Sequence, residues 1–215
     1  MDISNITAVG VSYKHKHLTI ASINSIKKHH PDMKFIIIDG SEENSECRLF
    51  VQNELSKDPN IKCLLSNVNI GHGRGMNTLL NRVTTKYAIV FDSDMEMTET
   101  PLEEMLKVIG DNYGVGEIQY VNKEGINIPQ YPISIPYLHP YFCMINVEQY
   151  KKFKPFFHHG APCLSAMWDL FIQKKSNLLI DFPVKKYIKH DFGGTSDLER
   201  KIGNTRFGVG DWGKI

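Results

Sequence analysis

Short apolar runs alternate with segments of helical spacing through the first 91 residues of this chain. The apolar runs cover residues 6–12, 35–38, 62–65 and 87–91, and the segments that suit helices cover residues 19–29, 45–55 and 76–83. This order favours an α/β fold with a mostly parallel central sheet and helices on both faces. Such a sheet gathers binding residues at the carboxyl ends of its strands.

The pattern is weaker after residue 101. We expect helices at residues 102–109 and 164–174, a strand at 178–182, loops with short strands at 122–140, and a further loop at 155–162. Residues 191–215 are rich in glycine, which favours a flexible tail or lid. Because 215 residues suit one domain and no repeat or low-complexity linker divides them, we expect a single domain. Its two halves would be residues 1–100 and 101–190.

The composition excludes few functions but does set the compartment that we expect. Lys and Arg number 25 against 24 Asp and Glu, a balance that demands neither a nucleic acid nor an anionic membrane as partner. The four cysteines show no CxxC spacing, which favours reduced thiols. No stretch approaches the roughly 20 apolar residues of a transmembrane helix, and we find no signal peptide. We therefore expect a cytoplasmic protein without a transmembrane segment.

Two carboxylates, Asp92 and Asp94, stand directly after the apolar run at residues 87–91. In extended chain, alternate side chains point to the same face, so the two would repel unless a cation lay between them. The motif therefore indicates a metal site, although a surface turn of Asp, Ser and Asp is the alternative. Asp39 likewise follows an apolar run, at residues 35–38.

A glycine-rich segment, NIGHGRGMN, covers residues 69–77. It is not a dinucleotide fingerprint, because Met76 stands where the third glycine is needed, and it lacks the Gly-Lys-Ser/Thr of a P-loop. As a tight turn into a helix it would bring backbone N–H groups and Arg74 near a ligand phosphate. The alternative is a plain turn with Asn77 in the first turn of the helix.

Taken in order, these motifs resemble the nucleotide-sugar half of a family 2 glycosyltransferase with the GT-A (nucleotide-diphospho-sugar transferase) fold. The resemblance covers roughly the first 100 residues. Its markers are Asp39-Gly40-Ser41, Asn69-Ile70-Gly71, Asn77 and the Asp-x-Asp of Asp92-Ser93-Asp94.

The resemblance implies a donor, a metal and a set of site residues. The donor is a nucleotide-sugar, with UDP-sugars preferred, and the metal is divalent, with Mn²⁺ preferred because imidazole suits it and Mg²⁺ as the alternative. Asp94 would bind the metal, Asp92 the ribose or a metal-bound water, and Asp39 the base or ribose. The expected metal ligands are Asp92, Asp94 and His190, and the expected donor-binding residues are Asp39, Asn69, Gly71, Arg74, Asn77, Asp92 and Ser93.

An inverting transfer also needs a general base for the acceptor hydroxyl. Relatives take it from a Glu-Asp pair at a helix start; here Trp168 replaces the Glu and Asp169 is retained. Asp169 is the predicted base, although it could align with a later Asp of the family pattern. A helix-start Asp favoured by the helix dipole is the other alternative.

The acceptor and the activity have several possibilities. The acceptor is a hydroxyl-bearing molecule such as a glycan, or a modified nucleobase if this is a phage-type enzyme. A nucleotidyltransferase is a second enzyme class, but VSYKHKHL after the first apolar run lacks the glycines that grip a triphosphate. A non-catalytic nucleotide-sugar-binding module is the third hypothesis.

Overall fold

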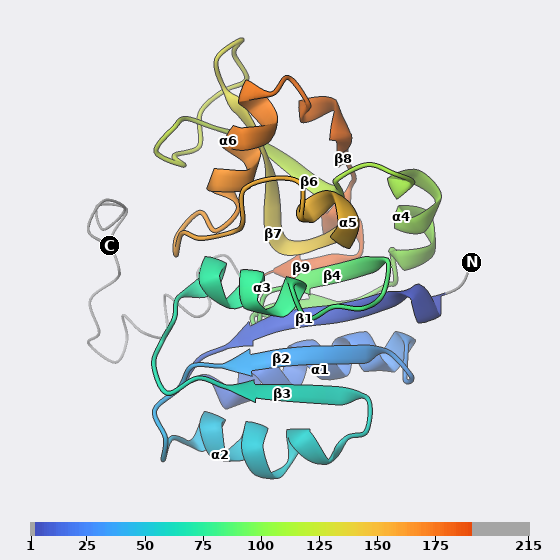
Figure 1. The fold of residues 1–215 in the computed structure, drawn as a ribbon. Helices are drawn as coiled ribbons and strands as arrows, with labels where there is room; N and C mark the ends of the chain where they lie inside the picture. Colours follow the sequence, from blue (N-terminus) through green and yellow to red (C-terminus); the bar gives the residue numbers. More distant parts are fainter. Residues whose placement is uncertain (1–2, 191–215) are drawn as a thin grey trace.

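The computed structural model describes residues 3–190 and shows a seven-stranded sheet with a small two-stranded ribbon (Figure 1). The strands are β1 (Ile6–Ser12), β2 (Lys34–Asp39), β3 (Ile61–Leu65), β4 (Tyr87–Phe91), β5 (Met95–Met97), β6 (Gly114–Val121), β7 (Ile135–Asn146), β8 (Leu179–Asp181) and β9 (Ile188–His190). The α-helices are α1 (Lys16–His29), α2 (Glu46–Asn53), α3 (His72–Leu80), α4 (Leu102–Ile109), α5 (Val147–Tyr150) and α6 (Leu164–Ile172). Short 3-10 helices cover Ile3–Asn5, Leu55–Lys57, Ser176–Leu178 and Val184–Lys186.

The order of strands in the large sheet is β3-β2-β1-β4-β7-β6-β8. The first four are parallel, β7 is antiparallel to β4 and β6, and β8 is parallel to β6. The α/β class and the mostly parallel sheet that the sequence predicts are confirmed. Parallel pairing places the carboxyl ends of β1 to β4 at one edge, where Asp39 and Asp92 stand.

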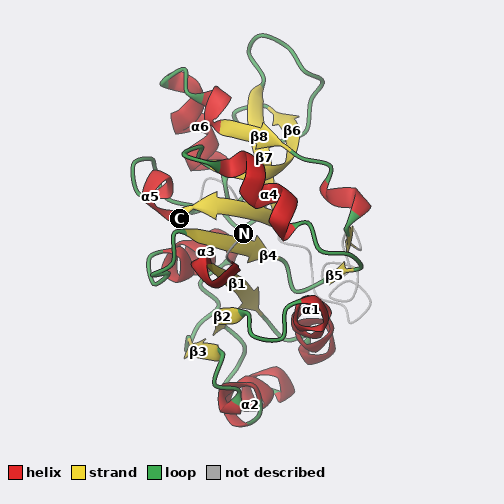
Figure 2. Cartoon of the chain, turned by 90° about the vertical axis from the view of Figure 1, so that its right-hand side faces the viewer, coloured by secondary structure: helices red, strands yellow, loops and turns green. Residues whose placement is uncertain are grey.

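Helices cover both faces of the sheet because the strands carry apolar side chains on both sides. One buried cluster joins the sheet to α3, α5 and α6, with Met76, Tyr150 and Met167 among its members. A second cluster joins the opposite face to α1, α2 and α4. Figure 2 shows α3, α5 and α6 on one side and α1 on the other.

Two sequence predictions need correction. The sequence predicts loops and short strands at residues 122–140, but β7 begins at Ile135 and continues to Asn146. Its two proline residues obscured the strand, yet Pro136 pairs with Tyr120 and the strand is almost wholly buried. In addition, α3 begins at His72, within the glycine-rich segment, so only residues 69–71 precede the helix and Asn77 is past the first helical turn.

The ribbon of β5 and β9 brings distant parts of the chain together. Met95 pairs with His190 in antiparallel register, and Met97 pairs with Ile188. This pairing places His190 beside the Asp-x-Asp turn. The predicted tail at residues 191–215 lies outside the described residues. Within residues 3–190, no helix has the length and apolar character needed to cross a membrane.

Candidate metal and donor site

Asp92 and Asp94 lie in a tight turn between β4 and β5. The backbone N–H of Asp92 donates to the carbonyl of Tyr141 at 2.9 Å, so β7 holds the start of the turn in place. The two side chains are 17% and 11% exposed, respectively. Both carboxylates are therefore largely covered yet reach solvent at the carboxyl edge of the sheet.

His190 completes this cluster from β9. Its Nε2 lies 3.2 Å from Oδ1 of Asp94 and 3.7 Å from Oδ2 of Asp92. The ring stacks on Tyr141 with centroids 4.7 Å apart and planes at 16°, and the Tyr141 hydroxyl donates to Glu117 at 2.7 Å. The hydrogen bond to Glu117 holds the ring of Tyr141, and stacking on this ring fixes the plane of the His190 imidazole.

The donor atoms of Asp92, Asp94 and His190 fit a divalent cation. One ligand atom from each residue lies within 4.8 Å of the other two. Two adjacent ligands at about 2.1 Å from an ion are themselves about 3 Å apart, which is close to the observed separations. The structure thus brings together the three residues predicted as metal ligands. Ser93 lies between the two carboxylates in the same turn.

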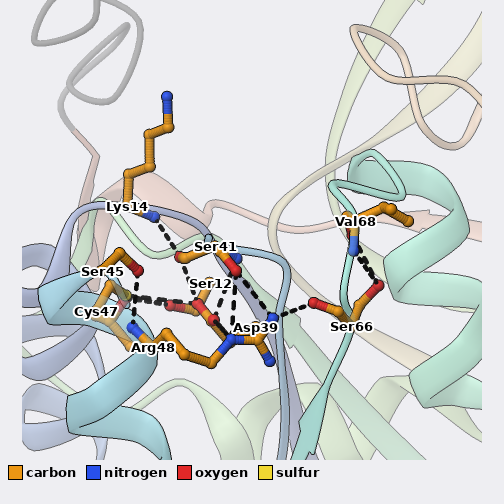
Figure 3. A network of polar contacts seen from close by, with 10 residues as sticks. Ser12, Lys14, Asp39, Ser41, Ser45, Cys47, Arg48, Ser66 and Val68 are labelled. Carbon is orange, nitrogen blue, oxygen red and sulfur yellow. Dashed lines mark hydrogen bonds and ion pairs between the residues drawn. The ribbon is translucent and has the colours of Figure 1, made fainter. Parts of the chain in front are cut away.

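Asp39 has a different environment from the one expected for a residue that binds the nucleotide base. Its side chain is 0% exposed and accepts hydrogen bonds from the Ser41 backbone and hydroxyl at 3.1 and 2.8 Å. Nε of the buried Arg48 lies 3.4 Å from Oδ2, and the Cys47 thiol lies 3.5 Å from Oδ1 (Figure 3). The protein itself encloses this carboxylate.

Arg48 connects Asp39 to the neighbouring strand ends. Its guanidinium donates to the carbonyl of Ser41 at 2.9 Å and to the carbonyl of Ser66, which follows β3. The network therefore ties together the chain after β2 and after β3. Its described contacts indicate a structural role for Asp39.

The sequence predicts that the start of α3 offers amides to a phosphate, but protein groups accept hydrogen bonds from three of its N–H groups. The N–H of Gly71 donates to Oδ1 of Asn69 at 3.0 Å. The next two N–H groups donate to Nδ1 of His159 at 3.3 Å and to the carbonyl of His158 at 2.9 Å. Arg74 lies over the ring of Phe157 at 4.4 Å. A phosphate would have to displace these contacts.

Asn77, another predicted donor-binding residue, joins two helices. Its Oδ1 accepts hydrogen bonds from the Tyr150 hydroxyl at 2.8 Å and from Nδ2 of Asn81 at 2.9 Å. Tyr150 belongs to α5, so this contact links α3 to the second half of the chain. The observed partners give Asn77 a packing role.

The family of this chain follows from a sequence match. The sequence profile of glycosyl transferase family 2 matches residues 9–169, well over half of the chain. The chain belongs to glycosyl transferase family 2. No curated protein matches its sequence. Membership disfavours the nucleotidyltransferase alternative.

Solved structures share the fold of this family 2 chain. The mannosyltransferase PcManGT from Pyrobaculum calidifontis, in complex with GDP-Man and Mn²⁺, has a TM-score of 0.60 at 13% identity, covering 83% of this chain and 55% of that one. S. aureus TarS 1–349 in complex with UDP has a TM-score of 0.55 at 16% identity, covering 85% and 59%. GalNAc-T7 with UDP, GalNAc and Mn²⁺ has a TM-score of 0.60 at 9% identity, covering 77% and 40%. The GT-A fold is thereby confirmed, and the chain spans between 40% and 59% of the length of these structures.

Asp169 lies well inside α6 rather than at its start, which removes the helix-dipole alternative. Its Oδ2 accepts a hydrogen bond from the backbone of Lys154 at 2.9 Å, and its Oδ1 accepts one from Gln173 at 3.0 Å. Within residues 3–190, no described contact joins Asp169 to the metal cluster. Its role as general base stays a prediction.

Two histidines at the candidate site are not predicted from the sequence. Nε2 of His72, at the start of α3, lies 3.0 Å from Oδ1 of Asp92. Burial opposes charge on His72, but the carboxylate of Asp92 raises its pKa overall. His139 is half-buried on β7 with its ring 5.0 Å from that of Tyr141, and burial lowers its pKa. The available signal for His72 is its place in the glycine-rich segment, whereas His139 carries none, because β7 is not predicted from the sequence.

Proposed function

We propose that this family 2 chain is a divalent-cation-dependent glycosyltransferase that moves a sugar from a nucleotide-sugar, with UDP-sugars preferred, to a hydroxyl group. The observation that carries the proposal is the convergence of Asp92, Asp94 and His190 from two distant segments at the carboxyl edge of the sheet. The Mn²⁺ and nucleotides bound in solved structures of the same fold support it.

Sugar transfer requires a positive charge near the leaving group. A divalent cation stabilises the negative charge that develops on a departing nucleoside diphosphate. Asp94 and His190 would hold the cation directly, and Asp92 would face it through Oδ2. Mn²⁺ is preferred over Mg²⁺ because one of the three ligands is an imidazole nitrogen.

An inverting transfer further requires a group that removes the proton from the acceptor hydroxyl. We keep Asp169 as the candidate. To reach an acceptor, its carboxylate would have to give up the hydrogen bonds from Lys154 and Gln173. The acceptor is proposed only by chemical class, as a hydroxyl on a glycan or on a modified nucleobase.

The partners of Asp169 also favour a second candidate function. A chain whose predicted base is engaged in packing could bind a nucleotide-sugar without transferring it. A transferase and such a binding module share the metal site but differ in turnover.

The test measures nucleotide release from UDP-sugars and GDP-mannose with Mn²⁺, with Mg²⁺ or with EDTA, in the presence and absence of acceptors. We expect Mn²⁺-dependent release that an acceptor accelerates. Equal release in EDTA would contradict the metal role. Donor binding by calorimetry without release under any condition would establish the binding module.

A further inference from the structure

His72 is the first residue of α3, and the loop at residues 157–159 fixes its backbone. The N–H of His72 donates to Nδ1 of His159 at 3.3 Å, and the N–H of Gly73 donates to the carbonyl of His158 at 2.9 Å. A Cβ on Gly73 would stand only 2.4 Å from that carbonyl oxygen, so the close approach requires glycine. The start of α3 is therefore pressed against the loop, which fixes the origin of the His72 side chain.

The His72 ring approaches the end of β4. Its Nε2 lies 3.0 Å from Oδ1 of Asp92, whereas Oδ2 of the same carboxylate faces Nε2 of His190 at 3.7 Å. The side chains of His72 and Asp92 are 24% and 17% exposed, respectively. The two oxygens of Asp92 are thus divided between two imidazoles, one on α3 and one on β9.

We propose that His72 is a positioning residue that holds Asp92 in the orientation needed to bind the cation. The inference rests on the metal site of the proposed function. His190 Nε2 is near Oδ2 of Asp92 and Oδ1 of Asp94, so a cation held beside His190 would meet these two oxygens. The other oxygen of Asp92, Oδ1, faces His72.

The reason is mechanical. A carboxylate on a turn can rotate about its side-chain bonds, and binding an ion would cost that freedom. A ring nitrogen against one oxygen removes much of the freedom before the ion arrives. Partners of this kind, which orient a ligand without being one, typically change metal affinity 10- to 100-fold in other proteins.

The test compares His72→Phe, which keeps a ring without a donor, with His72→Gln, which keeps an N–H donor. The dissociation constant for Mn²⁺ is measured without any donor sugar, from the free-ion signal in electron paramagnetic resonance. We expect His72→Phe to weaken binding about 10- to 100-fold and His72→Gln to stay within about 3-fold of the parent. The matched control is His30→Phe, because His30 contacts Thr100 instead of the carboxylates.

The outcomes separate this inference from the proposed function. Parental affinity in His72→Phe would overturn the positioning role, and so would equal loss in His72→Phe and His72→Gln, because the imidazole itself would then be required. Failure of the metal site looks different, since the parent and Asp94→Asn would then bind Mn²⁺ equally weakly. Circular dichroism shows whether His72→Phe folds. If it does not, His72→Asn takes its place, because the Asn side chain is shorter than that of Gln and extends less far toward Asp92. The same outcomes apply.

Discussion

Two carboxylate sites at the same edge of the sheet, one after β2 and one after β4, have opposite surroundings. Asp39 is fully buried, and Arg48, Ser41 and Cys47 surround both of its oxygens. Asp92 and Asp94 face imidazoles and keep some exposure. The chain itself supplies the cation beside Asp39, whereas the described partners of Asp92 and Asp94 are imidazoles. Two carboxylates at strand ends along the same edge can therefore have very different surroundings.

The largest effect is expected when the closed site is broken. Asp39→Ala leaves the guanidinium of Arg48 buried without its carboxylate, and removing one partner of a buried pair typically costs about 3–5 kcal/mol. We expect that loss in the free energy of unfolding, measured by urea denaturation, with the Mn²⁺ affinity of the remaining folded protein unchanged. Because replacing both partners by apolar groups is often neutral, Asp39→Ala with Arg48→Met should recover much of the loss. If Asp39→Ala is as stable as the parent but binds nucleotide more weakly, Asp39 belongs to the donor site instead.

The second prediction breaks the open site. Asp94→Asn removes a charged ligand while keeping its size, and we expect Mn²⁺-dependent nucleotide release to fall about 100-fold or more, equivalent to about 2.7 kcal/mol. The free energy of unfolding should stay near the parental value, because the change also removes repulsion from Asp92. Asp111→Asn is the matched control, since the Asp111 side chain is 95% exposed. An unfolded Asp94→Asn would show that the two sites differ less than their surroundings suggest.

These two sites also show how much of the structure can be predicted from the sequence. The apolar runs located β1, β2 and β4, which are almost wholly buried, and β3, which is only partly buried. The family resemblance predicts the Asp-x-Asp and His190 as metal ligands. The enclosure of Asp39 could not be read, because Arg48 lies in a helical segment where a charged residue is normally solvated. His72 resembled part of a glycine-rich turn. The strands β5 and β9, of three residues each, are too short to carry a pattern.

A third carboxylate, Asp169, is intermediate between the two sites, since it is partly covered and accepts two hydrogen bonds. If it is the general base, Asp169→Asn should slow sugar transfer about 100-fold while donor and Mn²⁺ affinities hold. Slow donor hydrolysis can replace transfer as the assay until an acceptor is known. If packing is its whole role, only stability should change, by about 1 kcal/mol for a weakened hydrogen bond.

The smallest expected effect concerns the support behind the open site. Burial opposes charge on Glu117, but hydrogen bonds from Lys185, Gln119 and Tyr141 lower its pKa overall. A carboxylate with a lowered folded pKa stabilises the protein above its unfolded value of about 4.5, and this contribution is lost as the pH falls through the folded pKa. Melting temperatures of the parent and Glu117→Gln should therefore differ at pH 6 and converge in more acidic buffer. A constant difference across that range would contradict the assignment.

The short ribbon of β5 and β9 has a consequence for how the chain is held together. Asp94 and His190 are 96 residues apart in sequence, yet only three register pairs join their strands. An ion shared by both residues would act as a reversible cross-link across that span. Because closing a loop costs more entropy as the loop grows, a tie at this point gives more than a tie between neighbours. Chelation should then loosen β9 first, which hydrogen exchange at residues 188–190 would register before any change in the large sheet.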